Sequence, residues 1–186
     1  DRRLQIGGEK RKSLAETMDL GPTLLEFFGV EIPKDMLGKP LRGVMETDSP
    51  VREYGIFGSH SGVLSVTDGK YVLMVAPKDK EGGLYNYTLM TTHMRSRMSV
   101  EELQQASLAG PFSFTKGCRV LKIPAICKKM SDLPVGGELV FDVAEDPKQE
   151  HPLEDNGISA RLKEAMIRIL EENDAPAELY DYYGLK

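Results

Sequence analysis

The chain has 186 residues, of which 40% are hydrophobic and 28% are charged, and this composition is ordinary for a soluble globular domain. No apolar run approaches the roughly 20 residues of a membrane-spanning helix, so we expect no membrane partner. The formal net charge of −5 argues against nucleic acid as a partner of the whole chain.

A short helix is predicted over residues 18–30. Asp19 stands where a side chain can accept a hydrogen bond from a free backbone amide. Pro22 falls in the first turn, where its missing N–H costs little, and Gly29 ends the helix. The side chains expected on its buried face are Leu24, Leu25, Phe27 and Phe28. Prolines and a glycine then predict a loop over residues 30–41.

Short apolar runs next predict a set of β-strands. They cover residues 54–57, 63–67, 70–75, 119–123 and 138–143. Asp68-Gly69 separates the second run from the third, and this pair predicts a hairpin in which both turn positions have positive φ. Residues 77–98 show no sustained period, so we expect a loop there.

Two more helices are predicted in the second half of the chain. Ser99 and Glu102 have the spacing of a capping box, which favours a helix over residues 99–108 with its apolar face beginning at Val100 and Leu103. A long amphipathic helix follows at residues 158–170 and ends before Pro176. Its apolar positions are Ile158, Leu162, Ala165, Met166, Ile169 and Leu170.

These elements predict an α+β fold. A small antiparallel sheet of three to five strands needs one face covered, and the long C-terminal helix can cover it. The short N-terminal helix stands apart from this unit.

Four side chains are candidates for binding an anionic group. His60 lies among serines and glycines on a predicted accessible loop, where binding groups collect. His93 and Arg95 lie in a stretch rich in hydroxyls and guanidiniums, and Lys116 follows a threonine. The structural alternatives are a plain turn at His60, surface ion pairs at His93 and Arg95, and solvation of Lys116. The three histidines show no metal-ligand spacing.

Charge is unevenly distributed along the chain. Residues 78–130 carry nine Lys/Arg and four Asp/Glu, a local +5, whereas residues 132–186 carry five Lys/Arg and fourteen Asp/Glu, a local −9. The basic stretch could face an anionic small molecule. The alternative, that the two halves pair across the surface, is the simpler interpretation.

Several stretches together resemble the sulfatase family of the alkaline-phosphatase-like superfamily. Residues 16–41, ETMDLGPTLLEFFGVEIPKDMLGKPL, are similar to the segment that follows the sulfatase catalytic core. Residues 138–153 resemble the later E-L-Y-D-L-x-x-D-P stretch, with Phe141 in place of the usual Tyr and His151-Pro152 in place of the usual Asn. TDGKYVLM (67–74) resembles a family hairpin, and residues 158–176 resemble the terminal helix. The resemblance spans nearly the whole chain.

The resemblance implies a parent enzyme that hydrolyses anionic sulfate esters with a divalent cation, usually Ca²⁺, and a formylglycine nucleophile. Formylglycine is made from Cys or Ser in a C/S-x-P/A-x-R motif, and neither Cys118 nor Cys127 begins one. No catalytic or metal-binding residue is therefore assigned, no cofactor is expected in this chain, and the isolated chain is expected to be inactive. Residues 1–50 would be the tail of the catalytic domain, including the N-terminal helix, and residues 51–186 a C-terminal subdomain that helps wall the substrate cleft.

The cysteines also bear on the compartment. Two are too few for a disulfide framework, although a single bridge between them stays open. Isolated cysteines are more often small buried hydrophobes, so this usage favours a reducing compartment such as the cytoplasm without deciding the localisation.

Two alternative functions stay open. The parent could be a related phosphodiesterase or phosphonate hydrolase, because the nucleophile that would discriminate is not found here. The chain could also be a non-catalytic module that self-associates as a homo-oligomer through residues 18–30, whose apolar face would be exposed without a catalytic domain.

Overall fold

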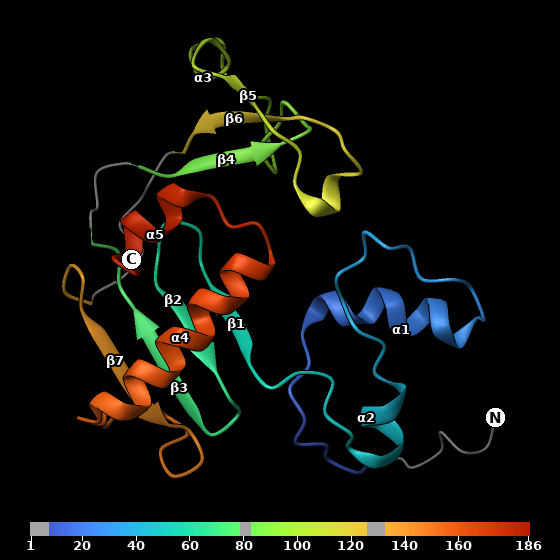
Figure 1. The fold of residues 1–186 in the computed structure, drawn as a ribbon, viewed down its shortest axis with the longest axis vertical. Helices are drawn as coiled ribbons and strands as arrows, with labels where there is room; N and C mark the ends of the chain where they lie inside the picture. Colours follow the sequence, from blue (N-terminus) through green and yellow to red (C-terminus); the bar gives the residue numbers. More distant parts are fainter. Residues whose placement is uncertain (1–7, 79–82, 126–132) are drawn as a thin grey trace.

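The structure, a computed structural model, describes residues 8–78, 83–125 and 133–186. A four-stranded antiparallel sheet carries a long helix across one face, a second, three-stranded sheet lies beyond the end of that helix, and the N-terminal segment lies beside the first sheet (Figure 1). This arrangement confirms the predicted α+β class and the small sheet covered by the C-terminal helix. Along the described residues, no helix combines the length and apolar character needed to cross a bilayer.

The first sheet has the strand order β1-β2-β3-β7, with every neighbour antiparallel. Its strands are β1 (Gly55–Gly58), β2 (Leu64–Thr67), β3 (Tyr71–Val75) and β7 (Glu138–Asp142), which confirms four of the five predicted strands. Helix α4 (Asn156–Glu172) packs Leu162 and Met166 against Val66 and Leu73 of the sheet, and all four side chains are fully buried. This contact is the centre of the hydrophobic core.

The predicted hairpin between β2 and β3 is confirmed, but its turn differs from the prediction. Gly69 has a φ of +90°, whereas Asp68 is not in the positive-φ region. The Asp68 carboxylate instead accepts hydrogen bonds from the backbone N–H groups of Lys70 at 2.9 Å and Tyr71 at 2.7 Å. The side chain closes the turn, so only the glycine needs the left-handed conformation.

A second sheet, which the sequence analysis did not predict, has the order β4-β6-β5. Its strands are β4 (Tyr85–Thr88), β5 (Ser107–Ala109) and β6 (Val120–Pro124). The prediction of a loop over residues 77–98 is therefore wrong at β4, and the predicted strand at residues 119–123 belongs to this sheet. Strands β4 and β5 are short and carry polar residues, so they lack the apolar pattern that reveals a strand.

This second sheet is an insertion within a hairpin. Strands β3 and β7 pair directly, and their pairing continues through Ala76 N–H to Gly137 O at 2.9 Å and Gly136 N–H to Pro77 O at 2.8 Å. Everything between residues 77 and 136 thus leaves and re-enters the first sheet at one point.

The helices of the second half are confirmed in part. Helix α3 (Val100–Gln104) has the predicted capping box between Ser99 and Glu102, but it is shorter than predicted, and its Val100 and Leu103 are exposed. In α4, the Asp155 carboxylate caps the first turn by accepting from two backbone N–H groups. Helix α4 ends at Glu172, before Pro176 as predicted, and Pro176 is the N-cap of an unpredicted helix, α5 (Ala177–Tyr183), which buries its tyrosines.

The N-terminal segment contains a 3₁₀ turn, η2 (Thr17–Asp19), and helices α1 (Leu20–Phe27) and α2 (Arg42–Thr47). Gly29 follows α1 with a φ of +69°, as predicted for a helix end. The predicted burial is wrong, because Leu24, Phe27 and Phe28 are exposed and Leu25 is half-buried. No described element covers this face. Asp19 does not cap α1 with its side chain; its role is described below.

Candidate functional site

Two neighbouring cavities lie where the second sheet meets helix α5. The first, of about 410 Å³, is lined by His60 and is called the His60 cavity. The second, of about 520 Å³, is lined by Phe114 and is called the Phe114 cavity. Tyr87 and Pro176 line both, so the two cavities adjoin and together form what we call the α5 groove. Each is large enough for a small molecule.

A polar cluster joins the second sheet to α5 at Tyr87, the residue of the cluster that lines both cavities. The Tyr87 hydroxyl donates to the Glu178 carboxylate, and Lys122 Nζ lies 2.7 Å from Glu178 Oε1. Lys122 also lies over the Tyr85 ring, 4.1 Å from its centroid. Burial would raise the pKa of Glu178, but the donors Lys122 and Tyr87 outweigh it and lower that pKa. The lysine charge is therefore neutralised within the cluster.

His60 is exposed on the loop between β1 and β2, at the edge of its cavity. The loop is held onto α5 by the Tyr182 hydroxyl, which donates to Ser61 O at 3.2 Å, and by the Tyr183 hydroxyl, which donates to Gly62 O at 2.8 Å. The structure therefore places this predicted residue at a cavity with a fixed loop beneath it. Its binding role stays a prediction.

The other three predicted residues lie elsewhere. His93 is exposed, and its Nε2 lies 2.8 Å from Glu102 Oε1. Arg95 is exposed in the same loop, and neither residue lines the α5 groove. Lys116 follows a residue of the Phe114 cavity, but its Nζ pairs with Asp35 at 3.2 Å. The four candidates therefore do not converge on one site, and their binding roles stay predictions.

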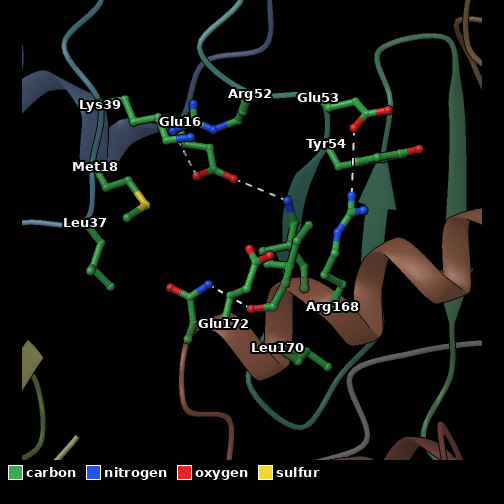
Figure 2. A pocket seen from close by; sticks show the side chains of 13 residues that line it. Glu16, Met18, Leu37, Lys39, Arg52, Glu53, Tyr54, Arg168, Leu170 and Glu172 are labelled. Atoms are coloured by element: carbon green, nitrogen blue, oxygen red, sulfur yellow. Dashed lines mark hydrogen bonds and ion pairs between the residues drawn. The ribbon is translucent and has the colours of Figure 1, made fainter. Parts of the chain in front are cut away.

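A third cavity, of about 580 Å³, separates the N-terminal segment from α4 (Figure 2). Three cationic and three acidic side chains line it: Lys39, Arg52, Arg168, Glu16, Glu53 and Glu172. Lys39 Nζ donates to Val51 O at 3.0 Å, and Arg168 lies 3.8 Å from Glu53. Because its cations already face carboxylates or a carbonyl, this cavity does not have the character of an anion site.

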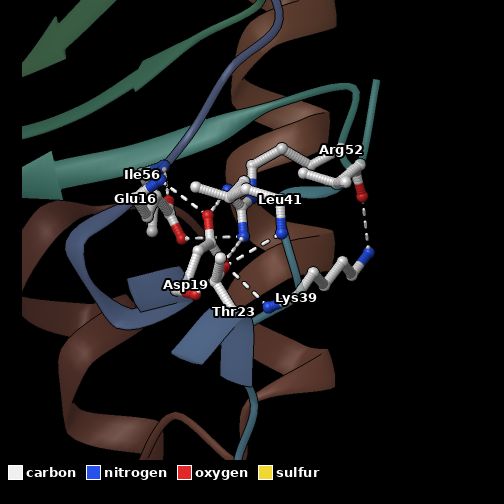
Figure 3. Close-up of polar contacts among 8 residues, drawn as sticks. Glu16, Asp19, Thr23, Lys39, Leu41, Arg52 and Ile56 are labelled. Carbon is white, nitrogen blue, oxygen red and sulfur yellow. Dashed lines mark hydrogen bonds and ion pairs between the residues drawn. The ribbon is translucent and has the colours of Figure 1, made fainter. Parts of the chain in front are cut away.

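The buried Asp19 carboxylate organises one wall of that cavity (Figure 3). Its side chain is 0% exposed, and both terminal nitrogens of Arg52 donate to it. It also accepts from the backbone N–H groups of Lys39 at 2.8 Å and Glu16 at 2.7 Å. A Cβ on Gly38 would lie 2.1 Å from Met18 O, so the close approach of this loop requires glycine.

The charge on Asp19 is stabilised by this network. Burial alone would raise its pKa, but the hydrogen bonds from Arg52, Lys39 and Glu16 outweigh burial and lower the pKa to about 2. The sequence predicts Asp19 as a helix cap and gives no direct sign of the pair, since Arg52 lies 33 residues away. The only sequence signal for the buried pair was the position of Asp19, a charged residue at the start of an apolar helix.

Metal ligation has no support from the described part of the chain, where no group of three or more His, Cys, Asp or Glu side chains is placed to hold an ion. Cys118, rejected as a nucleophile on its sequence context, is an exposed free cysteine. Cys127, rejected on the same ground, lies outside the described residues.

Comparison with known proteins finds no matching family model and no matching curated protein. Among solved structures, the chain is similar to BT4656, determined in complex with its substrate D-glucosamine-2-N,6-O-disulfate, at 16% identity and a TM-score of 0.41. The match covers 83% of this chain and 22% of BT4656, so the chain spans about a fifth of the length of that protein. At this TM-score the similarity is a coarse one between arrangements of elements.

Proposed function

We propose that this chain is the C-terminal portion of a sulfatase-like hydrolase. Residues 1–50 would end the catalytic domain, and residues 51–186 would form the C-terminal subdomain. The observation that carries the proposal is the exposed apolar face of α1, which lies in the segment with the strongest resemblance to sulfatases. Phe28 on this face is 73% exposed, and Leu24 and Phe27 are exposed beside it. An amphipathic helix normally buries such a face, and the catalytic domain is the proposed cover.

The Asp19–Arg52 pair supports this role because it holds α1 against the part of the chain that leads into β1. Glu16 extends the link, since its carboxylate accepts from the Ile56 backbone N–H at 3.2 Å. The exposed face of α1 is thus presented in a fixed orientation. A catalytic domain docked there would bring its own nucleophile, formylglycine, and its own divalent cation, which is usually Ca²⁺ in sulfatases.

The proposed contribution of this chain to catalysis is to shape the substrate cleft. His60 is the best-supported contact for an anionic ester, because it alone of the four candidates lines a cavity of the α5 groove. A neutral or protonated imidazole can donate to an ester oxygen. His93, Arg95 and Lys116 are proposed as further contacts from the surrounding loops.

The expected result with the isolated chain is no turnover of an aryl sulfate such as 4-nitrophenyl sulfate in the presence of Ca²⁺. The longer natural polypeptide, carrying the sequence upstream of residue 1, is expected to hydrolyse it. Release of 4-nitrophenolate, followed by absorbance, measures both. Without the nucleophile and the cation, the remaining groups cannot stabilise the charge on the transferred sulfate.

Turnover by the isolated chain that survives Cys118→Ala and Cys127→Ala would contradict the proposal. A parallel assay with bis(4-nitrophenyl) phosphate and with a phosphonate monoester separates the alternative reactions. If the longer polypeptide cleaves these and not the sulfate, the parent is a phosphodiesterase or phosphonate hydrolase.

A second candidate, the self-associating module, is favoured by the same exposed face of α1. The isolated chain is then expected to dimerise at micromolar concentrations through residues 18–30, and Phe28→Asp should return it to a monomer, because a charge cannot be buried in an apolar contact. Sedimentation velocity measures the change. Met94→Asp is the matched control, since Met94 is 97% exposed and outside this segment. A wild-type monomer rules the module out.

A further inference from the structure

The Phe114 cavity has a chemical character opposite to that of an anion site. Three aromatic side chains, Tyr87, Phe112 and Phe114, line it together with the thioether of Met90. Among the described residues that line it, Asp174 alone carries a formal charge. Two lysines near the cavity are paired with carboxylates: Lys116 with Asp35 at 3.2 Å, and Lys122, whose Nζ lies 5.6 Å from the Tyr87 ring centroid, with Glu178 at 2.7 Å. The cavity therefore combines aromatic faces with one negative charge.

The aromatic rings form two walls set at right angles. Phe112 and Phe114 are stacked, with ring centroids 5.5 Å apart and an interplanar angle of 4°. Tyr87 stands nearly perpendicular to Phe112, at 5.2 Å and 86°. The face of an aromatic ring carries negative electrostatic potential, so rings on two walls of one cavity favour a positively charged guest. Phe114 and Met90 are exposed, so the cavity is open to solvent.

The Asp174 carboxylate is held beside these rings. Asp174 follows the end of α4 with a φ of +55°, and its Oδ2 accepts from the backbone N–H of Ser113 at 2.7 Å. Ser113 lies between Phe112 and Phe114 in the chain. The hydrogen bonds from Ser113 lower the pKa of Asp174, so the carboxylate is ionised at neutral pH.

We infer that the Phe114 cavity binds a small organic cation, of the alkylammonium or quaternary ammonium class. Aromatic rings attract such cations through their faces, and a nearby carboxylate adds a charge of the complementary sign. The volume of about 520 Å³ admits a trimethylammonium group with its substituent. This inference does not depend on the proposed sulfatase-like function, because it concerns the isolated chain and uses none of the ester contacts.

The test compares choline with 3,3-dimethylbutan-1-ol, which has the same shape without the charge. Isothermal titration of the 186-residue chain is expected to show saturable binding of choline and of tetramethylammonium. The neutral alcohol should bind at least about fivefold more weakly, since it keeps the apolar contacts and loses the attraction to rings and carboxylate. Methyl sulfate, an anion, should not bind at this cavity.

Two conservative variants locate the site. Asp174→Asn keeps an oxygen that can accept from Ser113 and removes the charge, and Phe114→Leu keeps an apolar side chain and removes the ring. Each is expected to weaken choline binding about fivefold. Phe57→Leu, the same change at a ring of the His60 cavity, should leave the affinity unchanged. Circular dichroism of each variant checks that it is folded.

Three results would overturn the inference: no choline binding up to about 100 mM, equal binding of the neutral alcohol, or unchanged affinity in both folded variants. Equal binding of the alcohol would show an apolar cavity without preference for charge. None of these results would affect the sulfate-ester proposal, which the turnover of the longer polypeptide tests separately.

Discussion

Arg52→Ala is expected to lower the free energy of unfolding by about 3 kcal/mol, because it leaves the Asp19 carboxylate buried without its partner. Urea unfolding followed by far-UV circular dichroism measures the change. Lys70→Ala is the matched control, since it removes an exposed pair with Asp142 at 3.6 Å, and pairs of this kind contribute at most about 1 kcal/mol. A loss for Arg52→Ala no larger than for Lys70→Ala would contradict the role of the pair.

The pH dependence of the free energy of unfolding is an independent test of the same pair. The pKa of Asp19 is lowered from 3.8 to about 2 in the folded chain. A lowered folded-state pKa contributes stability that is fully present above the unfolded value and is lost as the pH falls through the folded value. Between pH 4 and pH 2 the wild type should therefore lose about 2 kcal/mol more than Asp19→Asn. Parallel pH curves for the two proteins would show that Asp19 is not stabilised in this way.

Leu162→Ala is expected to lower the free energy of unfolding by about 3 kcal/mol, because it opens a cavity where α4 meets the first sheet. Leu162 is 0% exposed, whereas Leu89, at 63% exposed, offers the same substitution on the surface. Leu89→Ala should cost less than about 0.5 kcal/mol. Urea unfolding of both variants gives the comparison. Similar losses of free energy of unfolding at the two positions would show that Leu162 does not contribute to the hydrophobic core between α4 and the first sheet.

Arg52→Ala and Leu162→Ala also test whether the N-terminal segment and the first sheet unfold independently. Arg52→Ala removes the tie between the N-terminal segment and the first sheet, and Leu162→Ala weakens the sheet and α4 themselves. If residues 8–50 can detach without unfolding the remainder, Arg52→Ala should expose backbone amides of α1 to hydrogen exchange and leave those of β3 protected. This outcome would place a domain boundary near residue 50, where the sulfatase-like proposal puts it.

The first sheet and α4 could be predicted because their signals are local and repeated. Residues 63–75 contain two apolar runs on either side of a turn pair, and residues 158–170 repeat their apolar positions with the helical period over three turns. The start of α3 was also readable, since Ser99 and Glu102 act on amides within three residues of themselves. Interactions of this range depend on the neighbouring sequence alone.

The second sheet, α5 and the burial of each face could not be predicted in this way. Strand β4 is only four residues long and reads YNYT, so its pairing with β6 across more than thirty residues has no local sign. The exposed face of α1 has the same composition as a buried one, and only the absence of a covering element among the described residues distinguishes it. Of the four candidate binding residues, only His60 lines a cavity of the α5 groove in the structure. His93 and Lys116 are instead paired with Glu102 and Asp35, and the sequence gives no local sign of either pair.

The sequence by itself therefore determined the α+β class, the hairpin at Asp68-Gly69, the long amphipathic helix and the resemblance to sulfatases. Only the tertiary structure decided that Asp19 is a buried partner of Arg52, that Tyr87 and Pro176 divide two cavities, and that Asp174 stands beside stacked phenylalanines. The physical reason is the range of the interactions. Periodicity, capping and turn geometry are fixed by residues a few positions apart, whereas ion pairs, ring contacts and cavities arise when distant segments pack together.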